Sequence, residues 1–306
     1  MRYSNKRGSA RRSGGAEWSE PVKLALAALA VLTLLACWRF GTQPHYALDA
    51  ASPAAPEDVD AELKDLAITD VDRDVETHGA RTLALDMLDG DARITSGDPV
   101  ILTGSYSGTV YVNAPEETVH LILSGVDITA KTGSALVVEE ADRVIITLAE
   151  GTKNVLTDAG SYPADTDCDG CIYAVCDLTF NGTGSLEVNG LHQDGIRSTD
   201  RVKIVEGSYR VEAKRNAIRG NDGIRVAGGT LFLGSEKNGM MTTKSGADGR
   251  GDLVISGGEV SVVAGRYAFV VRKGQLYFLD CRVTTNAVVG DFDIHGTRYI
   301  EDGCMS

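Results

Sequence analysis

The feature that most constrains the fold is a phrase repeated at a fixed interval of 22 residues. The chain reads QDGIRSTD at 193–200, RNAIRGND at 215–222 and KNGMMTTK at 237–244. Around these phrases, apolar residues recur as Ile-x5-apolar-x-apolar, a glycine turn, then apolar-x-apolar. Three short strands per copy, held in phase, are typical of a parallel β-helix, because a single coil cannot bury its apolar side chains without stacked neighbours.

The repeat can be followed through five copies from Ile172 onward, and it assigns the inward position of each coil. The residues placed at the first inward position of the five copies are Ile172, Ile196, Ile218, Met240 and Val270. A β-sandwich is the competing all-β fold. It would explain the alternation of apolar and polar residues but not a register kept over successive copies. We therefore expect an all-β parallel β-helix.

The N-terminal residues differ from the repeats in composition and charge. Residues 1–38 combine a basic start with an uncharged apolar run from Leu24 to Trp38 that is short for a membrane span and typical of a signal peptide. The run ends in Leu-Leu-Ala-Cys, which resembles a bacterial lipobox with Cys37 as the acylated residue. An uncleaved signal anchor is the alternative. In both cases the rest of the chain is expected outside the cytoplasm, at the outer face of a bacterial cell membrane.

Two further segments follow. Residues 39–90 are Ala/Pro-rich and then acidic, and we expect a flexible tether with a short helix near 57–66. Residues 91–306 should form the β-helix. The formal net charge is −13, which disfavours nucleic acid as a partner and suits a protein that recruits hard cations such as Ca²⁺.

Cysteine usage favours disulfides over zinc in an exported protein. Beyond Cys37 the chain has five cysteines, without a second CxxC or nearby histidines. We expect one bridge within 168–176 and one between Cys281 and Cys304.

The repeated phrase itself has structural and functional interpretations. Asp194, Asn216 and Asn238 share one phase, and stacked amides can form a hydrogen-bonded ladder that needs no ligand. Asp194 places a carboxylate in this series of amides, so it is expected to bind a cation or to pair with an arginine. Arg197 and Arg219 follow the inward isoleucines, so they should stack on the outer surface.

These two arginines have two possible roles. Their guanidinium groups can bind sugar carboxylates, or they can pair with Asp200 and Asp222, and the sequence leaves both open. Arg197, Arg219 and Asp222 are the candidate carbohydrate-binding residues.

An acidic loop precedes the first full coil. Asp165, Asp167 and Asp169 alternate before a glycine, as at the start of an EF-hand calcium loop. The twelfth position is Cys176 instead of glutamate, so an EF-hand is rejected. A Ca²⁺ site of another geometry is expected from these three residues with Asp194, and a solvated acidic turn is the alternative.

Residues from about 94 to 290 resemble a bacterial surface family of carbohydrate-binding domain-containing proteins. The resemblance rests on VILTGSYSGTVYVNAPEETVHLILSGVDIT, SALVVEEADRVIITLAEGTKNVLTDAGSY and CIYAVCDLTFNGTGSLEV. It implies a right-handed parallel β-helix similar to pectate lyases, bound Ca²⁺, and affinity for polysaccharides, including acidic pectin-type chains. Two departures stand out: Cys171 replaces the usual small residue of the first copy, and Met240-Met241 end the basic column after two coils.

Three functions follow as hypotheses. The first is a non-catalytic, calcium-dependent surface protein that binds an acidic or cellulose-like polysaccharide. The second is a polysaccharide lyase acting on uronic-acid polymers, with an arginine as base and Ca²⁺ to acidify the sugar proton. The third is a structural or adhesion protein without a glycan ligand, which the low aromatic content of 6% would suit.

Overall fold

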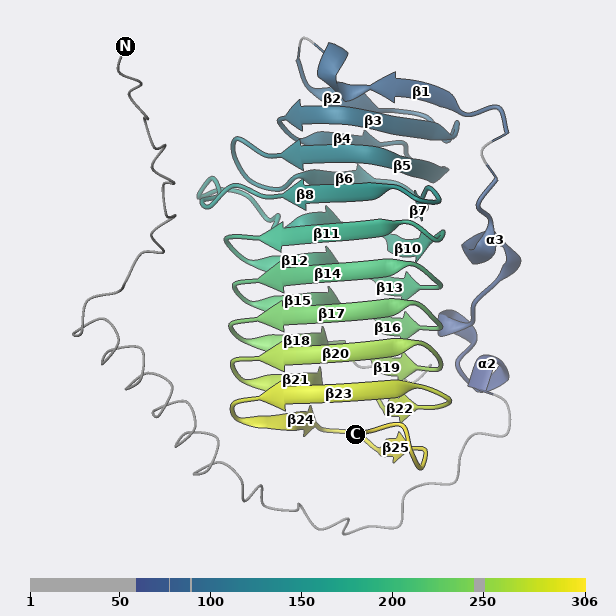
Figure 1. Ribbon diagram of the computed structural model, residues 1–306, viewed down its shortest axis with the longest axis vertical. Helices are drawn as coiled ribbons and strands as arrows, with labels where there is room; N and C mark the ends of the chain where they lie inside the picture. The colour runs from purple at the N-terminus through teal and green to yellow at the C-terminus, as the bar shows by residue number, and fades with distance from the viewer. Residues whose placement is uncertain (1–58, 77, 89, 245–250) are drawn as a thin grey trace, which may run out of the picture. The chain divides into compact units, whose positions relative to one another are not determined.

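Stacked coils of short parallel strands make up the computed structural model, which describes residues 59–306 apart from 77, 89 and 245–250 (Figure 1). Each coil contributes one strand to each of three outer faces, here called faces A, B and C. All strand pairs between successive coils are parallel. The parallel β-helix architecture expected from the 22-residue repeat is therefore present.

Face A is a continuous ladder of six-residue and five-residue strands. Its strands are β8 (Lys153–Thr157), β11 (Ser185–Gly190), β14 (Ser208–Ala213), β17 (Thr230–Ser235), β20 (Glu259–Ala264) and β23 (Arg282–Ala287). Burial alternates along each of the middle strands, as it should when one surface of a sheet is in the core and the other is in water.

Face B is a separate nine-stranded sheet. Its strands are β2 (Ala92–Ile94), β4 (Val110–Asn113), β6 (Leu136–Glu140), β9 (Gly170–Ala174), β12 (Asp194–Ser198), β15 (Asn216–Gly220), β18 (Asn238–Thr242), β21 (Tyr267–Val271) and β24 (Gly290–Ile294). The register pairs Ile196 with Ile218 and Arg197 with Arg219, so the repeated phrase forms one strand of this sheet in each coil.

Face C closes each coil. Its strands are β7 (Arg143–Leu148), β10 (Asp177–Asn181), β13 (Arg201–Ile204), β16 (Gly223–Val226), β19 (Asp252–Ile255), β22 (Leu276–Phe278) and β25 (Arg298–Ile300). At the N-terminal end, β1 (Arg81–Ala84) pairs with β3 (Val100–Ser107), and β3 pairs with β5 (Thr118–Thr129). The long strand β5 pairs with both β7 and β8 and so joins faces A and C.

The core is a column of aliphatic and aromatic side chains inside the coils. Ile172, Ile196, Ile218 and Met240 are all 0% exposed, as the repeat predicts. In the fifth copy the expected inward residue was Val270, and this is wrong by one position. Met240 pairs with Phe269, and Val270 continues the outward column of Met241. The apolar run YAFVV has no alternation that would mark its inward residues, so the sequence pattern placed the inward residue one position too late.

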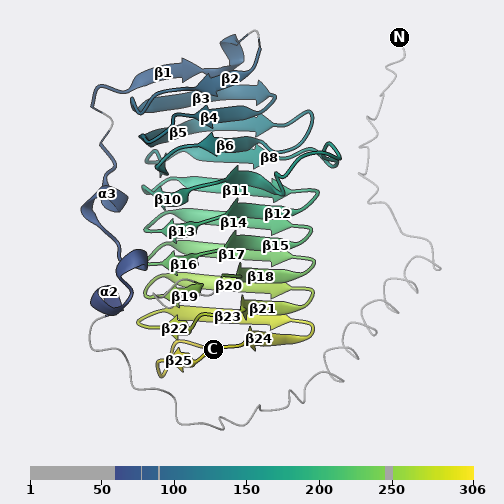
Figure 2. The ribbon, with the colours of Figure 1, turned by 180° about the vertical axis from the view of Figure 1, so that it is seen from behind.

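A segment that we call the strap, residues 59–76, lies along the outer surface of face C (Figure 2). It contains α2 (Val59–Glu62), the 3-10 helix η1 (Lys64–Leu66) and α3 (Asp70–Arg73), and α3 begins with a capping box between Thr69 and Asp72. Leu66 is 1% exposed and packs with Leu63 against Val254 and Tyr277.

The strap is also held by buried polar contacts. Lys203 donates to the carboxylate of Asp72 at 3.0 Å and to the carbonyl of Ala67 at 2.8 Å. The tether expected over 39–90 is therefore shorter than predicted, because its second half packs on face C and then enters the β-helix at β1. Its first half, like the apolar run and Cys37, lies outside the described residues. No helix in the described part of the chain is long and apolar enough to cross a membrane.

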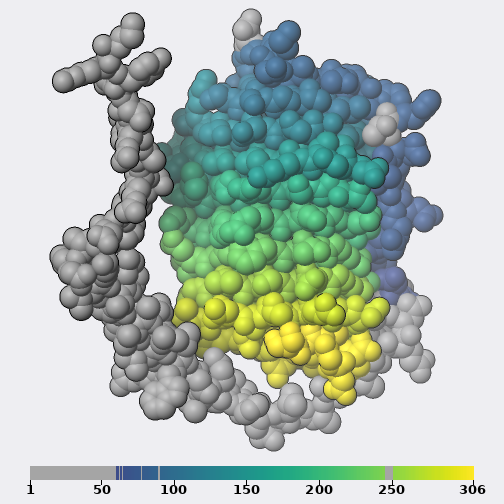
Figure 3. Space-filling model, in the orientation of Figure 1, coloured from purple at the N-terminus to yellow at the C-terminus, as the bar shows by residue number. Residues whose placement is uncertain are grey.

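In the space-filling view the coils follow one another as parallel bands from teal to yellow (Figure 3). At the N-terminal end, the 3-10 helix η2 (Leu85–Met87) lies against β3. These bands bring residues 22 positions apart in the sequence side by side on the surface, which is what allows a repeated phrase to build a site.

Candidate functional site

The loop between β8 and β9 is anchored at the corner where face A turns into face B. Asp158 is 1% exposed, accepts a hydrogen bond from the backbone N–H of Leu191 at 2.6 Å and accepts another from the Tyr162 hydroxyl at 2.7 Å. The ring of His192 stacks on Tyr162 with centroids 4.7 Å apart. Burial raises the pKa of Asp158. These contacts hold the acidic loop close to the coil that follows it.

The end of this loop brings Asp169 into contact with three arginines of face B and its corner. Arg197 Nη1 pairs with Asp169 Oδ2. Arg215 Nη1 and Arg219 Nη1 lie 3.6 and 3.9 Å from the same oxygen. The arginine side chains are 13%, 32% and 17% exposed, respectively, so each remains reachable from solvent. The guanidinium of Arg197 also lies over the Tyr173 ring, 5.8 Å from its centroid.

Beneath these arginines runs the ladder expected from the shared phase of Asp194, Asn216 and Asn238. The Asn216 side-chain amide donates to Asp194 Oδ1 at 2.7 Å, and the Asn238 amide donates to Asn216 Oδ1 at 2.8 Å. The three residues are 0%, 2% and 7% exposed. The structural interpretation of this column is confirmed: it is a buried polar ladder along the helix axis.

Asp194 also belongs to the electrostatic environment of the arginines. Arg215 Nε lies 3.9 Å from its Oδ1, and Arg219 Nη1 lies 4.0 Å from its Oδ2. Burial raises the pKa of the Asp194 carboxyl, and the carboxylate of Asp169 adds to this. The pKa of the Arg219 guanidinium is lowered, first by burial and then by the neighbouring Arg197.

This cluster of three arginines and two aspartates has a surplus of positive charge. Asp169 Oδ1, Asp194 Oδ2 and Arg197 Nε are buried and make no hydrogen bond to the described residues. Buried polar atoms normally have a partner, since leaving one unsatisfied costs roughly 1–3 kcal/mol. The surplus charge and the unsatisfied Arg197 Nε suit an acceptor group on a ligand, whereas the two unsatisfied carboxylate oxygens require donors such as hydroxyl groups.

The expected Ca²⁺ site does not fit these residues. Asp165 and Asp167 are exposed, while Asp169 and Asp194 are engaged by arginines and by Asn216. Among the described residues, no three histidine, cysteine or acidic side chains converge so that they could hold a metal ion. The aspartates alternate in an irregular loop, which does not place alternate side chains on one side as a strand would, so Ca²⁺ binding by this loop stays a prediction.

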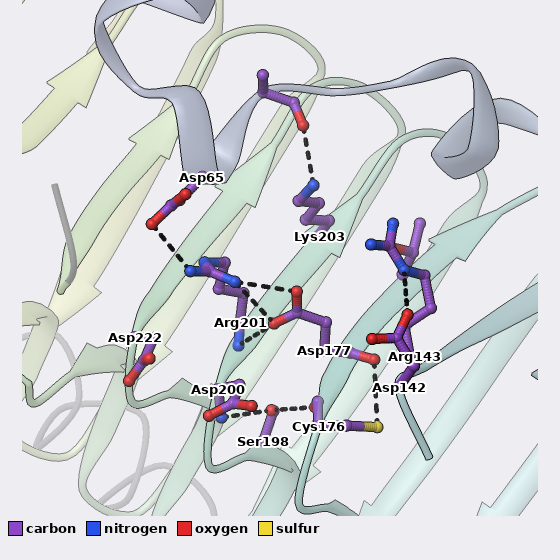
Figure 4. A network of polar contacts seen from close by, with 12 residues as sticks. Asp65, Asp142, Arg143, Cys176, Asp177, Ser198, Asp200, Arg201, Lys203 and Asp222 are labelled. Atoms are coloured by element: carbon purple, nitrogen blue, oxygen red, sulfur yellow. Dashed lines mark hydrogen bonds and ion pairs between the residues drawn. The ribbon is translucent and has the colours of Figure 1, made fainter. Parts of the chain in front are cut away.

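Asp222 does not join the arginine cluster either. It lies at the opposite corner, where face B turns into face C, near Asp200 (Figure 4). Its Oδ1 is 2.8 Å from Lys244 Nζ. Asp200, expected as a partner of Arg197, is 3.8 Å from the same lysine. The pairing of Arg197 and Arg219 with Asp200 and Asp222 is therefore wrong, and Asp169 takes their place.

Arg225 lies on β16 of face C, away from the arginine cluster. Near Asp222, Arg201 bridges Asp177 of face C and Asp65 of the strap at 3.1 and 3.0 Å. Arg225 is 5% exposed and pairs with Asp60 of the strap at 2.9 Å. It is thus covered on face C and is not part of the arginine cluster.

All five cysteines in the described part of the chain are free thiols. Cys171 is 0% exposed and takes the position of a small corner residue. Cys304 Sγ accepts a hydrogen bond from the backbone N–H of Cys281 at 3.4 Å, so this pair is close without a bridge. The two expected disulfides are not formed here.

Two residues of the cluster were missed by sequence reasoning. Arg215 precedes Asn216 in the same repeated phrase and donates to the Gln193 side chain at 2.9 Å, one coil earlier. Tyr173 pairs in register with Arg197. Arg215 already stands inside the repeated phrase, and Tyr173 occupies the phase of Arg197 in the preceding copy, so a comparison of every position across the copies would have found both.

Comparisons with known proteins match most of the β-helix. A family model described as carbohydrate-binding domain-containing protein matches residues 89–291. A protein of that description from Acetivibrio thermocellus is 33% identical over 135 residues, which cover 42% of this chain and 47% of that protein. The chain therefore spans about half the length of this curated relative.

Among solved structures, the polysaccharide lyase-like protein from C. thermocellum, in a gadolinium derivative, is similar with a TM-score of 0.70. The two chains are 26% identical, and the match covers 74% of this chain and 98% of that one. The shared fold therefore takes in nearly all of that structure.

Proposed function

The chain belongs to the family of carbohydrate-binding domain-containing proteins, and from this premise we propose that it binds an acidic polysaccharide on face B without cleaving it. The observation that carries the proposal is the convergence of Arg197, Arg215 and Arg219 on one oxygen of Asp169. Three guanidinium groups share two carboxylates, Asp169 and the more distant Asp194, in a protein whose formal net charge is −13.

Guanidinium groups suit this role because their planar donors match the two oxygens of a carboxylate. Arg197 and Arg219 are paired in register on successive strands, so their backbones are separated by about 4.8 Å. A polymer with repeated carboxylates, such as a uronic-acid chain, offers repeated partners to such a column. An isolated small anion would use only one of the stacked positions.

The proposal assigns charge recognition to arginine side chains and not to bound calcium. The four aspartates expected to hold Ca²⁺ do not form one ligand group, so no step of binding is routed through the metal here. Calcium dependence is checked directly by measuring binding with added CaCl₂ and with EDTA. Equal affinity in the two conditions is expected.

Isothermal titration calorimetry with a soluble galacturonic-acid oligomer tests the site. Arg219→Ala should weaken binding by about tenfold to a hundredfold, since a hydrogen bond to a charged group contributes roughly 1.5–3 kcal/mol. Arg210→Ala is the matched control, because Arg210 is an exposed arginine on face A, where it pairs with Glu212. Unchanged binding by Arg219→Ala would rule out the face B site.

Failure of the wild-type protein to retain any acidic or neutral glycan would instead favour the structural or adhesion hypothesis. This result would overturn carbohydrate binding as a whole, not only the choice of face.

One observation favours a second function, the polysaccharide lyase. Burial and the neighbouring Arg197 lower the pKa of Arg219, which is the direction required of a base that abstracts a sugar proton. The ultraviolet absorbance of the unsaturated product, followed during incubation with polygalacturonate, separates the two functions. We expect no product; its formation in the wild type and its loss in Arg219→Ala would establish the lyase.

The location of this binding protein is part of the proposal. The basic start, the apolar run and the lipobox-like ending at Cys37 support attachment to the outer face of a bacterial cell membrane. Mass spectrometry of the mature N-terminus checks this: an acylated Cys37 indicates a lipoprotein, and an intact residue 1 indicates a signal anchor. A mature chain with neither would contradict attachment.

A further inference from the structure

A second concave site lies at the N-terminal end of the β-helix, away from the arginine cluster. A cavity of about 450 Å³ is formed where η2 and the residues after it fold over the beginning of the coils at the corner between faces A and B. Its walls include Asp86, Asp91, Tyr106, Tyr111 and Lys131. This volume is within the range of about 300–1,000 Å³ typical of small-molecule sites.

The walls of the cavity are held by specific contacts. The Tyr106 hydroxyl donates to the carbonyl of Gly90 at 2.7 Å and accepts from the backbone N–H of Ala92 at 3.0 Å. The Tyr106 ring lies over Gly108, where a Cβ atom would be only 2.8 Å from the ring. A bare backbone is therefore required for this ring position. The cavity is preformed to that extent, which lowers the entropy lost when a ligand binds.

Carboxylates outnumber cations among the described residues that line the cavity, where Asp86 and Asp91 face Lys131. Arg93, beside the cavity, lies over the Tyr111 ring at 4.4 Å and pairs with both Asp91 and Glu139, at 3.7 and 3.6 Å. An anion is therefore disfavoured here, in contrast to the arginine cluster. Carboxylates, an ammonium group and phenol hydroxyls offer both acceptors and donors to a ligand rich in hydroxyl groups.

We infer that this cavity is a second saccharide site and that it takes an uncharged sugar unit, with Tyr111 and Lys131 as contact residues. The inference rests on the proposed function, carbohydrate binding, and assigns a second sugar class to a second place. Tyrosine suits a sugar because it combines a flat apolar ring with a polar hydroxyl.

The register of face B connects the cavity to the arginine cluster. Tyr111 pairs with Val137, Val137 with Tyr173, and Tyr173 with Arg197. Three strand spacings of about 4.8 Å separate Tyr111 from Arg197, which gives about 14 Å. One polysaccharide chain lying along the helix axis could thus contact both sites, with neutral units at the cavity and acidic units at the arginines.

The test titrates the wild-type protein in a calorimeter with two probes. Cellohexaose is uncharged, and the galacturonic-acid oligomer is negatively charged. Tyr111→Ala should weaken cellohexaose binding about tenfold or more, as expected for an aromatic contact residue, and leave the galacturonate affinity unchanged. Lys131→Ala should show the same selectivity. Tyr111→Phe keeps the ring and should retain most of the affinity.

The matched control is Phe232→Ala on face A, because Arg210 lies over that ring at the same 4.4 Å as Arg93 over Tyr111. Thermal unfolding followed by circular dichroism verifies that each variant is folded. Wild-type binding of galacturonate with no binding of cellohexaose would overturn this inference and leave the proposed function standing. Equal cellohexaose affinity in Tyr111→Ala and the wild type would also overturn it. If the wild-type protein binds neither probe, both this inference and the proposed function are overturned.

Discussion

The buried ladder of Asp194, Asn216 and Asn238 allows a quantitative test of how the coils are held together. Asn216 is the middle member: its side-chain N–H donates to Asp194 and its side-chain oxygen accepts from Asn238. Replacing Asn216 by alanine removes both hydrogen bonds at once. The end member, Asn238, makes only the second of them, and its own Oδ1 has no hydrogen-bond partner among the described residues.

The expected magnitudes follow from the number of groups left unsatisfied. Asn216→Ala leaves the Asn238 amide without its acceptor and Asp194 Oδ1 with only the backbone N–H of residue 216, at 3.0 Å. Each unsatisfied buried group costs roughly 1–3 kcal/mol, so we expect a loss of about 2–5 kcal/mol in the free energy of unfolding. Asn238→Ala leaves only one partner unsatisfied and should cost about half as much.

Urea unfolding followed by far-ultraviolet circular dichroism measures both losses, with the m-value checked for each variant. Asn286→Ala is the control, because Asn286 is exposed on β23 and its replacement should change stability by about 0.5 kcal/mol or less. A loss for Asn238→Ala equal to or greater than that for Asn216→Ala would refute the reasoning, because the cost would then not follow the number of broken hydrogen bonds.

Three further predictions concern stability. Lys203→Met should destabilise the protein by about 3–5 kcal/mol in urea unfolding, since it leaves Asp72 buried without its cation; a loss below about 1 kcal/mol would contradict a buried ion pair under the strap. Burial raises the pKa of Asp252 to about 6, above the ordinary 3.8, so its protonation stabilises the fold. The free energy of unfolding therefore contains a contribution that is complete below about pH 3.8 and is lost as the pH rises through about 6. The loss is at most about 3 kcal/mol. Asp252→Asn should flatten the profile of stability against pH measured across that window. Gly195→Ala should cost about 1–3 kcal/mol and lower the melting temperature, because a Cβ there would meet the Val211 side chain; an unchanged melting temperature would show that the corner can relax.

Much of the β-helix could be predicted because similar residue types recur at a fixed interval in the sequence. The inward isoleucines, the small corner residues and the stacked amides each follow from a 22-residue alignment and simple packing arguments. The inward position expected at Val270 was wrong, because five consecutive apolar or aromatic residues show no alternation there. Phe269 is the true inward residue, and only pairing with Met240 reveals it.

The strap illustrates a different limit. Its acidic sequence reads as a solvated tether, and its two leucines are too few to indicate a buried face. The reason it packs lies more than a hundred residues away, where Thr179, Lys203 and Arg225 line up on successive strands of face C. Long-range pairing of this kind leaves no periodic signal in the strap itself.

The sequence by itself determined the coil length, the identity of most core residues, the ladder of Asp194 with its amides, and the stacking of Arg197 on Arg219. Each of these depends on a residue and its counterpart one period away, so equal phase is enough. Only the tertiary structure decided which charges meet. Asp169 reaches the arginines, and Asp222 reaches Lys244, because irregular loops between strands place their side chains through contacts that no period encodes. The site proposed for an acidic polysaccharide is therefore built around an arginine cluster that equal phase alone does not reveal.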